Sequence, residues 1–214
     1  QPQTGQTACL DVEPGHYADG VGAVDQTPCD AGEYQPSSKS TNCKIVPAGH
    51  YSVGLGSIDF IACTPGTYQP TSGMSGCIDA DQGNYVGESS QLMQTPCSKG
   101  TYQPSTASSE CLSADAGYFV EESGAIEQTP CEAGSYQPIE GRSSCIYSSI
   151  NNYVPVSGSA DQIACEGGEH QPMPGQTGCV EKEDEGGLLP GFSSFFALMA
   201  LVGAASMITS RKQN

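Results

Sequence analysis

The chain has few basic residues. It carries 7 Lys and Arg against 24 Asp and Glu in 214 residues, a formal net charge of −17 at pH 7. Proteins that bind nucleic acids need the opposite sign, so this balance excludes nucleic acid as a partner. It is typical instead of a soluble surface whose copies repel one another.

The chain also lacks the residue sets that carry catalysis. It has three histidines and no glycine-rich loop of the kind that holds phosphates. His16 and His50 occupy equivalent places in a repeat, and His170 replaces a tyrosine that recurs elsewhere. A nucleophile, a base and an acid require an asymmetric arrangement, whereas these residues recur by translation. We therefore expect no enzyme activity, no catalytic residue and no bound cofactor.

Close pairs of cysteines are absent as well. Zinc sites usually bring two ligands within roughly two to four residues, but no two of the 11 cysteines are closer than 14 residues. Their spacing alternates between 20 and 14, so the chain repeats with a period of 34. Such a period indicates an array of small units, each meeting mainly its neighbours. Disulfides between these cysteines imply an oxidising, extracellular location.

The period divides the chain into repeats, a linker, an apolar segment and a short tail. The expected boundaries are 1–28 (truncated repeat), 29–62, 63–96, 97–130 and 131–164 (repeats), 165–180 (half repeat), 181–190 (acidic, glycine-containing linker), 191–210 (transmembrane or sorting helix) and 211–214 (cytoplasmic tail).

Two regular pairing schemes are open for the cysteines. Pairing across the long gap runs from Cys9–Cys29 to Cys145–Cys165 and leaves Cys179 alone. Pairing across the short gap leaves only Cys9, whose partner would stand upstream of residue 1 in a longer protein. We favour the short-gap scheme, in which the bonds are Cys29–Cys43, Cys63–Cys77, Cys97–Cys111, Cys131–Cys145 and Cys165–Cys179.

Each unit has the pattern of short strands between turns. Its first half follows the motif Cys63-Thr-Pro-Gly66-Thr-Tyr68-Gln69-Pro70. The glycine suits a turn with positive φ, and the proline forces the preceding glutamine to be extended. A helical repeat of the same length is excluded by 27 Gly and 15 Pro. The expected fold is a series of small disulfide-rich β repeats, arranged as tandem hairpin units in an elongated array.

Tyrosines recur at two places in the unit. We expect their rings to pack against the disulfide and cover the joint to the next unit, and the alternative is an aromatic ladder that binds glycans. The two series are Tyr34, Tyr68, Tyr102 and Tyr136, and Tyr17, Tyr51, Tyr85, Phe119 and Tyr153.

Over residues 1–180, the pattern Cys-x-x-Gly-x-Tyr-x-Pro, with a second cysteine at a separation of 14 from the first, resembles the cysteine-rich repeats of ephrin receptors and tumour-necrosis-factor receptors. Those families carry more cysteines per unit. The resemblance implies a β-rich ectodomain that makes extracellular contacts, and it transfers no ligand.

Paired carboxylates raise the alternative of calcium between units. Asp79 and Asp81 are spaced like the ligands of a short oxygen-donor loop. A structural site should repeat with the structure, but Pro47 and Ser149 break the pattern in two of five units. Calcium at Asp79 and Asp81 is therefore the weaker interpretation.

The far end of the chain predicts an anchor. Residues 186–210 contain no charge, and Leu188–Thr209 is just long enough to span a bilayer. Arg211 and Lys212 follow, which places the tail in the cytoplasm and the repeats outside. Pro190-Gly191-Phe192, the apolar segment and the basic pair resemble the Pro-Gly-Phe sorting signals of archaeal surface proteins. That resemblance implies processing by an archaeosortase-like enzyme and attachment to a lipid.

These observations predict a cell-surface structural stalk or adhesin, held at the membrane as a single-pass or lipid-anchored protein. One alternative is a receptor-like ectodomain whose repeats bind an extracellular protein or glycan. Another is a tether for an enzyme domain upstream of residue 1.

Overall fold

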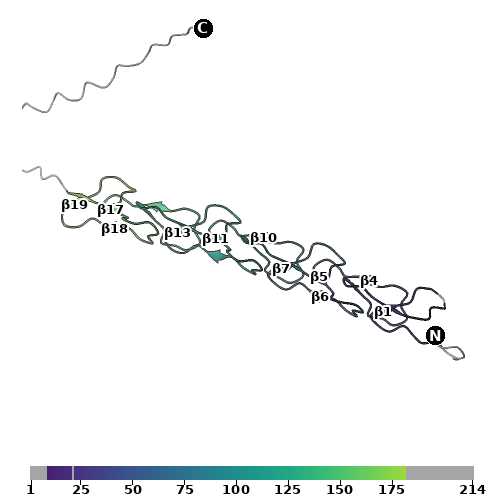
Figure 1. Ribbon diagram of the computed structural model, residues 1–214. Coiled ribbons are helices and arrows are strands. Elements are labelled where there is room, and N and C mark those ends of the chain that lie inside the picture. Colours follow the sequence, from purple (N-terminus) through teal and green to yellow (C-terminus); the bar gives the residue numbers. More distant parts are fainter. Residues whose placement is uncertain (1–8, 21, 182–214) are drawn as a thin grey trace, which may run out of the picture. The chain divides into compact units, whose positions relative to one another are not determined.

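The computed structural model describes residues 9–20 and 22–181, which form a row of small antiparallel hairpins (Figure 1). Every strand is two residues long, and each hairpin is a separate two-stranded sheet. The hairpins are β1 (His16–Tyr17) with β2 (Thr27–Pro28), β3 (Glu33–Tyr34) with β4 (Lys44–Ile45), β5 (His50–Tyr51) with β6 (Ile61–Ala62), β7 (Thr67–Tyr68) with β8 (Ile78–Asp79), β9 (Asn84–Tyr85) with β10 (Thr95–Pro96), β11 (Thr101–Tyr102) with β12 (Leu112–Ser113), β13 (Tyr118–Phe119) with β14 (Thr129–Pro130), β15 (Ser135–Tyr136) with β16 (Ile146–Tyr147), β17 (Asn152–Tyr153) with β18 (Ile163–Ala164), and β19 (Glu169–His170) with β20 (Val180–Glu181).

The hairpins recur at half the period of the cysteines. In β7–β8, Thr67 pairs with Asp79 and Tyr68 with Ile78. The next hairpin repeats this register, with Tyr85 opposite Thr95. Each repeat expected from the cysteines therefore contains two hairpins of the same backbone shape, one with a disulfide and one without. The two tyrosine series expected from the sequence fall on one structural position, the second residue of the leading strand.

Two lines of buried side chains form the core. Each hairpin adds one residue to each line. It therefore contributes two side chains to a shared core and has no core of its own. The first line alternates cysteine with a small residue and is fully buried, as Cys29, Val46, Cys63, Ala80, Cys97, Ala114, Cys131 and Ser148. The second line alternates glutamine with serine or valine and is at most 6% exposed, as Gln35, Ser52, Gln69, Val86, Gln103, Val120, Gln137, Val154 and Gln171.

Backbone hydrogen bonds join each hairpin to the next two. Before β7, the Gly66 N–H donates to the Val86 carbonyl in the following hairpin at 2.7 Å. After β8, the Ala80 carbonyl accepts from the Ala107 N–H, in the hairpin after that, at 2.8 Å. The same bonds recur along the array. They satisfy main-chain groups that such short strands leave unpaired, so stacking replaces the wide sheet that is absent from the described residues.

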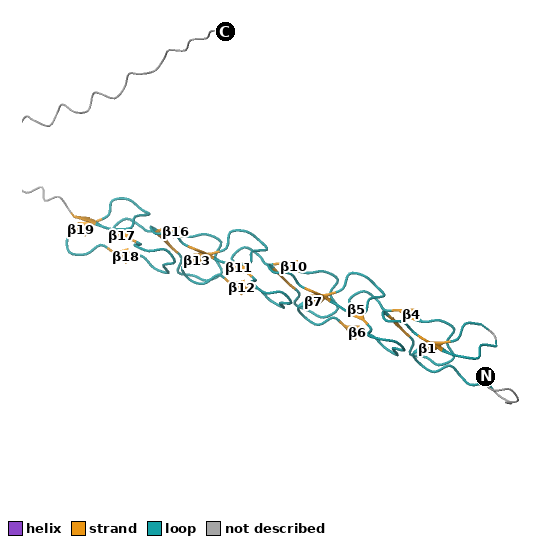
Figure 2. Ribbon diagram, in the orientation of Figure 1, coloured by secondary structure: helices purple, strands orange, loops and turns teal. Residues whose placement is uncertain are grey.

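Successive hairpins do not face the same way. In Figure 2, β4, β10 and β16 follow one edge of the array, and β6, β12 and β18 follow the other. Hairpins three positions apart therefore share an edge. The sequence repeats every two hairpins, so residues separated by one full period of 34 lie on different edges of the array.

Candidate functional site

The joints between hairpins and the bonds that close each hairpin are the recurring polar features of the described array. Five hairpins are closed by Cys29–Cys43, Cys63–Cys77, Cys97–Cys111, Cys131–Cys145 and Cys165–Cys179, with Cα–Cα distances of 5.7–5.8 Å. These are the bonds of the short-gap scheme. Cys9 is exposed and has a free thiol, and its expected upstream partner stays a prediction.

A buried glutamine holds the loop of each disulfide hairpin. The Gln69 side chain donates through Nε2 to the Gly76 carbonyl at 2.8 Å, and its Oε1 accepts from the Thr71 N–H at 3.1 Å. Gln69 is 2% exposed, so both ends of its amide are satisfied inside the loop. The same pair of bonds recurs at Gln35, Gln103, Gln137 and Gln171.

The alternate hairpins replace the disulfide with a second kind of glutamine. Gln94 stands half a period after Cys77, at the equivalent position of its hairpin. Its Oε1 accepts from the Asp81 N–H at 2.7 Å, and its Nε2 donates to Asp81 Oδ2 at 2.8 Å. We call this pair of bonds the glutamine clasp. It recurs between Gln26 and Glu13 and between Gln128 and Asp115, and in β17–β18 Gln162 bonds both the N–H and the Oγ of Ser149.

One hairpin, β5–β6, has neither a disulfide nor a clasp. Pro47 stands at the position of the acidic residue and has no N–H to donate. Phe60 stands at the position of the glutamine. Its ring makes edge contacts with Tyr34 and His50, at centroid distances of 4.9 and 4.8 Å. A hydrophobic closure thus occurs where the polar one cannot form.

The clasp engages one of the two acidic residues considered as calcium ligands. Asp81 is already hydrogen-bonded by Gln94 through its main chain and its side chain. Asp79 is exposed in β8, opposite Thr67. Within the part of the chain that the structure describes, no group of three or more His, Cys, Asp or Glu side chains is placed to hold a metal ion. At Ser149, which has no carboxylate, the N–H still donates to Gln162 Oε1, so the recurring feature is the main-chain hydrogen bond to glutamine.

The histidines lie in separate surroundings. His16 Nδ1 lies 3.2 Å from the Pro14 carbonyl, and the Nδ1 of His170 is buried without a hydrogen-bond partner. His50 has its Nδ1 3.1 Å from the Ala48 carbonyl and its Nε2 3.3 Å from Ser90 Oγ. The Ser90 N–H also donates to the Cys63 carbonyl, at 2.9 Å. The His50–Ser90 pair is therefore a contact between hairpins.

The predicted anchor lies outside the described residues. This holds for the apolar segment 191–210, for the sorting motif Pro190, Gly191 and Phe192, and for the tail 211–214. No helix long and apolar enough to cross a bilayer occurs in residues 9–20 and 22–181.

Two comparisons of the sequence with known proteins found no match. No protein-family model matches the chain, and no curated protein matches its sequence. The resemblances drawn from the cysteine pattern and the Pro-Gly-Phe motif remain predictions.

Proposed function

We propose that this protein is a cell-surface stalk, in which the hairpin array holds whatever is joined to it away from the membrane. The observation that carries the proposal is the recurrence of the same backbone bonds at successive joints. Gly66 to Val86, Gly83 to Gln103 and Gly100 to Val120 repeat one contact at 2.7–2.8 Å. A chain built by translation gains length with each unit, and length is the property of a spacer.

The closures also suit a load-bearing extracellular part. A disulfide in every second hairpin limits how far a local opening can spread along the chain. The glutamine clasp closes most of the hairpins between them, and it needs no oxidant. Disulfides and bonds to glutamine together close every described hairpin except β5–β6, although each hairpin contributes only two buried side chains.

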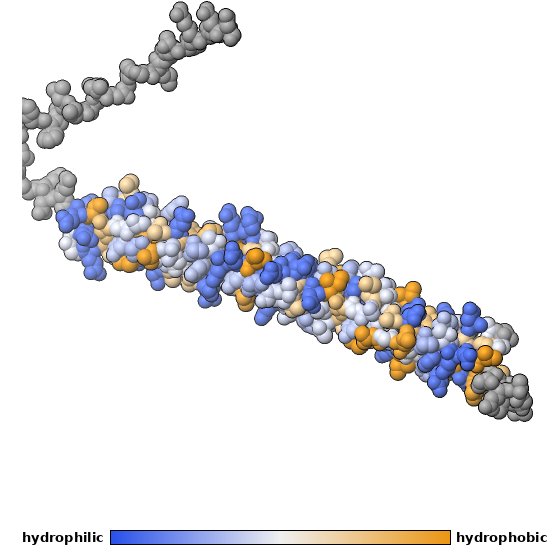
Figure 3. Space-filling model, in the orientation of Figure 1, coloured by the Kyte–Doolittle hydropathy of each residue, from blue (hydrophilic) through white to orange (hydrophobic). Residues whose placement is uncertain are grey.

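The surface favours a spacer over a self-associating fibre. At the same loop position, the first four hairpins without a disulfide carry Val24, Ile58, Leu92 and Ile126, which are 48–62% exposed, and the fifth carries the half-buried Ala160. The disulfide hairpins carry Thr41, Ser75, Ser109 and Ser143 there. Because every third hairpin shares an edge, apolar and hydroxyl side chains alternate along each edge. The face in Figure 3 accordingly shows apolar residues in separate spots.

A second function, adhesion to an extracellular protein or glycan, is favoured by one observation. Ile61, Leu112 and Ile163 lie in β6, β12 and β18, which share an edge, and they are 49, 44 and 47% exposed. Regularly placed aliphatic side chains on one edge would suit a repetitive partner.

The length of the array tests the stalk proposal. Deleting residues 63–96 from the full chain joins Ala62 to Cys97 and keeps the period, whereas duplicating residues 63–96 adds one unit. We expect the distance between the cell surface and a label at the N-terminus to fall and rise by equal steps. A distance that does not follow the number of units would refute the stalk. Loss of adhesion in an Ile61, Leu112 and Ile163 to Ser variant, with the distance unchanged, would favour the second function.

A further inference from the structure

In the described array, the residue just before the first strand of a hairpin is glycine in the first eight hairpins but not in the ninth. The first eight hairpins have a glycine there with φ between 76° and 91°, and the ninth has Asn151 with φ 64°. At each of the eight glycines, a β-carbon would overlap a main-chain carbonyl oxygen of the hairpin two further along. Asn151 keeps the positive φ of these glycines. Because it has a β-carbon, its side chain starts where the other joints place a carbonyl oxygen.

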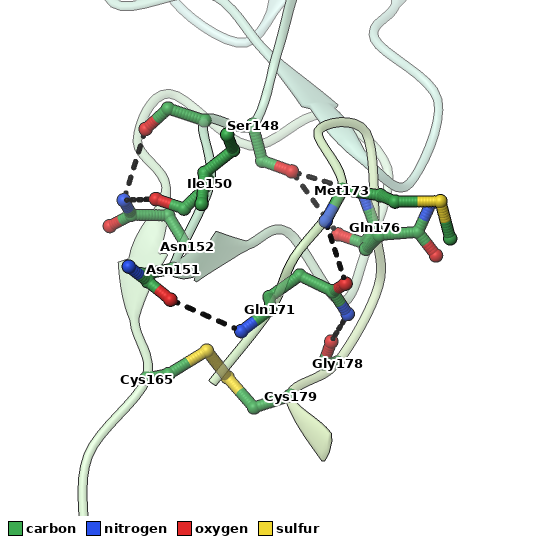
Figure 4. The surroundings of a disulfide bond; sticks show 11 residues. Ser148, Ile150, Asn151, Asn152, Cys165, Gln171, Met173, Gln176, Gly178 and Cys179 are labelled. Carbon is green, nitrogen blue, oxygen red and sulfur yellow. Dashed lines mark hydrogen bonds between the residues drawn. A yellow bond between two sulfur atoms is a disulfide. The ribbon is translucent and has the colours of Figure 1, made fainter. Parts of the chain in front are cut away.

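The Asn151 side chain also accepts a hydrogen bond that, at the equivalent joints, goes to a main-chain carbonyl of the following hairpin. The N–H groups of Gln69, Gln103 and Gln137 each donate to a carbonyl in the following hairpin at 3.0–3.2 Å. The equivalent N–H of Gln171 donates to Asn151 Oδ1 at 3.4 Å (Figure 4). Asn151 N–H in turn donates to the Gln171 carbonyl at 2.8 Å. Asn151 thus binds both main-chain groups of Gln171.

This bond matters because Gln171 is buried. The residue is 5% exposed, and a buried N–H without an acceptor is costly. The sequence pattern stops at the same place, since Glu185 and Gly187 stand where the next glycine and tyrosine would fall. The hairpin β19–β20 therefore needs an acceptor that the repeat pattern no longer supplies.

We propose that Asn151 is a stop residue that closes this end of the array to further hairpins. Its Oδ1 caps the Gln171 N–H, and its β-carbon blocks the place that a loop carbonyl occupies at the other joints. The next hairpin of this chain, or the first hairpin of a second copy, cannot stack here as the others do. One side chain thereby limits the number of hairpins, and this holds whether or not the array serves as a stalk.

An insertion experiment tests whether the Asn151 side chain prevents a further hairpin from stacking. A copy of residues 114–147 inserted after Glu181 continues the register and brings the loop carbonyl that corresponds to Gly124 onto position 151. We compare this insertion in the full chain with Asn151 and with the Asn151→Gly substitution, by amide hydrogen exchange. The first inserted hairpin should be protected at least about tenfold more with Asn151→Gly. Equal protection in both backgrounds would overturn the proposal.

A second measurement, without any insertion, tests the cap. Asn151→Gly removes the acceptor and tolerates positive φ, whereas Asn151→Asp keeps an oxygen at the same position. We expect the Gln171 amide to exchange about tenfold faster in Asn151→Gly than in the unmodified chain, with Asn151→Asp remaining close to it. No acceleration in Asn151→Gly would contradict the cap, and equal acceleration in both variants would show that the side-chain oxygen is not the acceptor.

Discussion

The carbonyl oxygen of Ala107 lies against Gly66, two hairpins earlier in the chain, so closely that a β-carbon at position 66 would overlap it. Gly66 also has φ 90°, a conformation that favours glycine. Two separate requirements, one local and one from stacking, therefore meet at the same residue. The recurring glycine of the sequence is thus a joint between hairpins as well as a turn.

Replacing Gly66 with Ala separates these two requirements. We expect Gly66→Ala to lower the free energy of unfolding by about 2–4 kcal/mol, because the backbone is strained and the Ala107 carbonyl must move. Gly54 is the matched control, since it has φ 77° and a β-carbon added there would meet nothing within 4 Å. Gly54→Ala should cost about 1 kcal/mol. Equal losses in urea unfolding would show that stacking does not depend on the close approach.

The glutamine clasp predicts a specific effect at Gln94. Gln94→Ala removes both bonds to Asp81 and should cost about 1 kcal/mol, with faster exchange of the Asp81 amide. Gln94→Glu should cost more at pH 7, because two carboxylates then face each other. Asp79→Asn is the control, as Asp79 is exposed in the same repeat. If Gln94→Ala unfolds like Asp79→Asn, the clasp contributes nothing.

The equivalence of the two hairpin types predicts that a clasp can be exchanged for a disulfide. Ala80 and Gln94 stand half a period after Cys63 and Cys77, so Ala80→Cys with Gln94→Cys should form a new bond. The oxidised form should be more stable than the reduced form by about 3 kcal/mol in the chain-entropy model. Peptide mapping under non-reducing conditions detects the bond. Ala80→Cys with Met93→Cys is the control, because Met93 is 70% exposed, and free thiols in both variants would contradict the equivalence.

Calcium removal should leave the array unchanged. Asp81 is engaged by Gln94, and the described residues offer no cluster of three or more metal-binding side chains. We therefore expect the same melting temperature with calcium and with a chelator. A fall in melting temperature on chelation that Asp79→Asn abolishes would restore the calcium interpretation.

The anchor prediction is tested by truncation. A chain that lacks Leu188–Asn214 should be released into the medium instead of remaining on the cell, because the segment expected to span the bilayer is removed. Surface labelling of intact cells and blotting of the medium measure the partition. A truncated chain that stays bound would place the anchor elsewhere.

Several features of the array were predictable from residue type and spacing. The short-gap scheme was favoured because it leaves only Cys9 unpaired, whose partner would stand upstream of residue 1, and its pairing is present in the structure, as in Cys63–Cys77. Asparagine tolerates the left-handed conformation of the glycines that Asn151 replaces, and Asn151 has φ 64°. Both inferences concern contacts within a hairpin or the conformation of one residue, which local sequence controls.

The clasp residues were missed, although the sequence carried a signal. Gln26, Gln94, Gln128 and Gln162 recur with the period of the cysteines, except where Phe60 stands, and each follows its partner at the same separation. Pro47 and Phe60 depart from the pattern together. Reading the acidic position alone suggested a calcium ligand, whereas reading it with its glutamine would have suggested a hydrogen-bonded pair.

By itself, the sequence determined the repeat and the left-handed turns, and it reduced the disulfides to two regular schemes, because cysteine and glycine have chemical or conformational properties that few other residues share. Only the tertiary structure decided that each unit holds two like hairpins, that each bonds to the next two, and that Asn151 binds both main-chain groups of Gln171. Those contacts join main-chain N–H and C=O groups of residues far apart in the chain. Nearly every residue carries these groups, so the pairing leaves little trace in residue type.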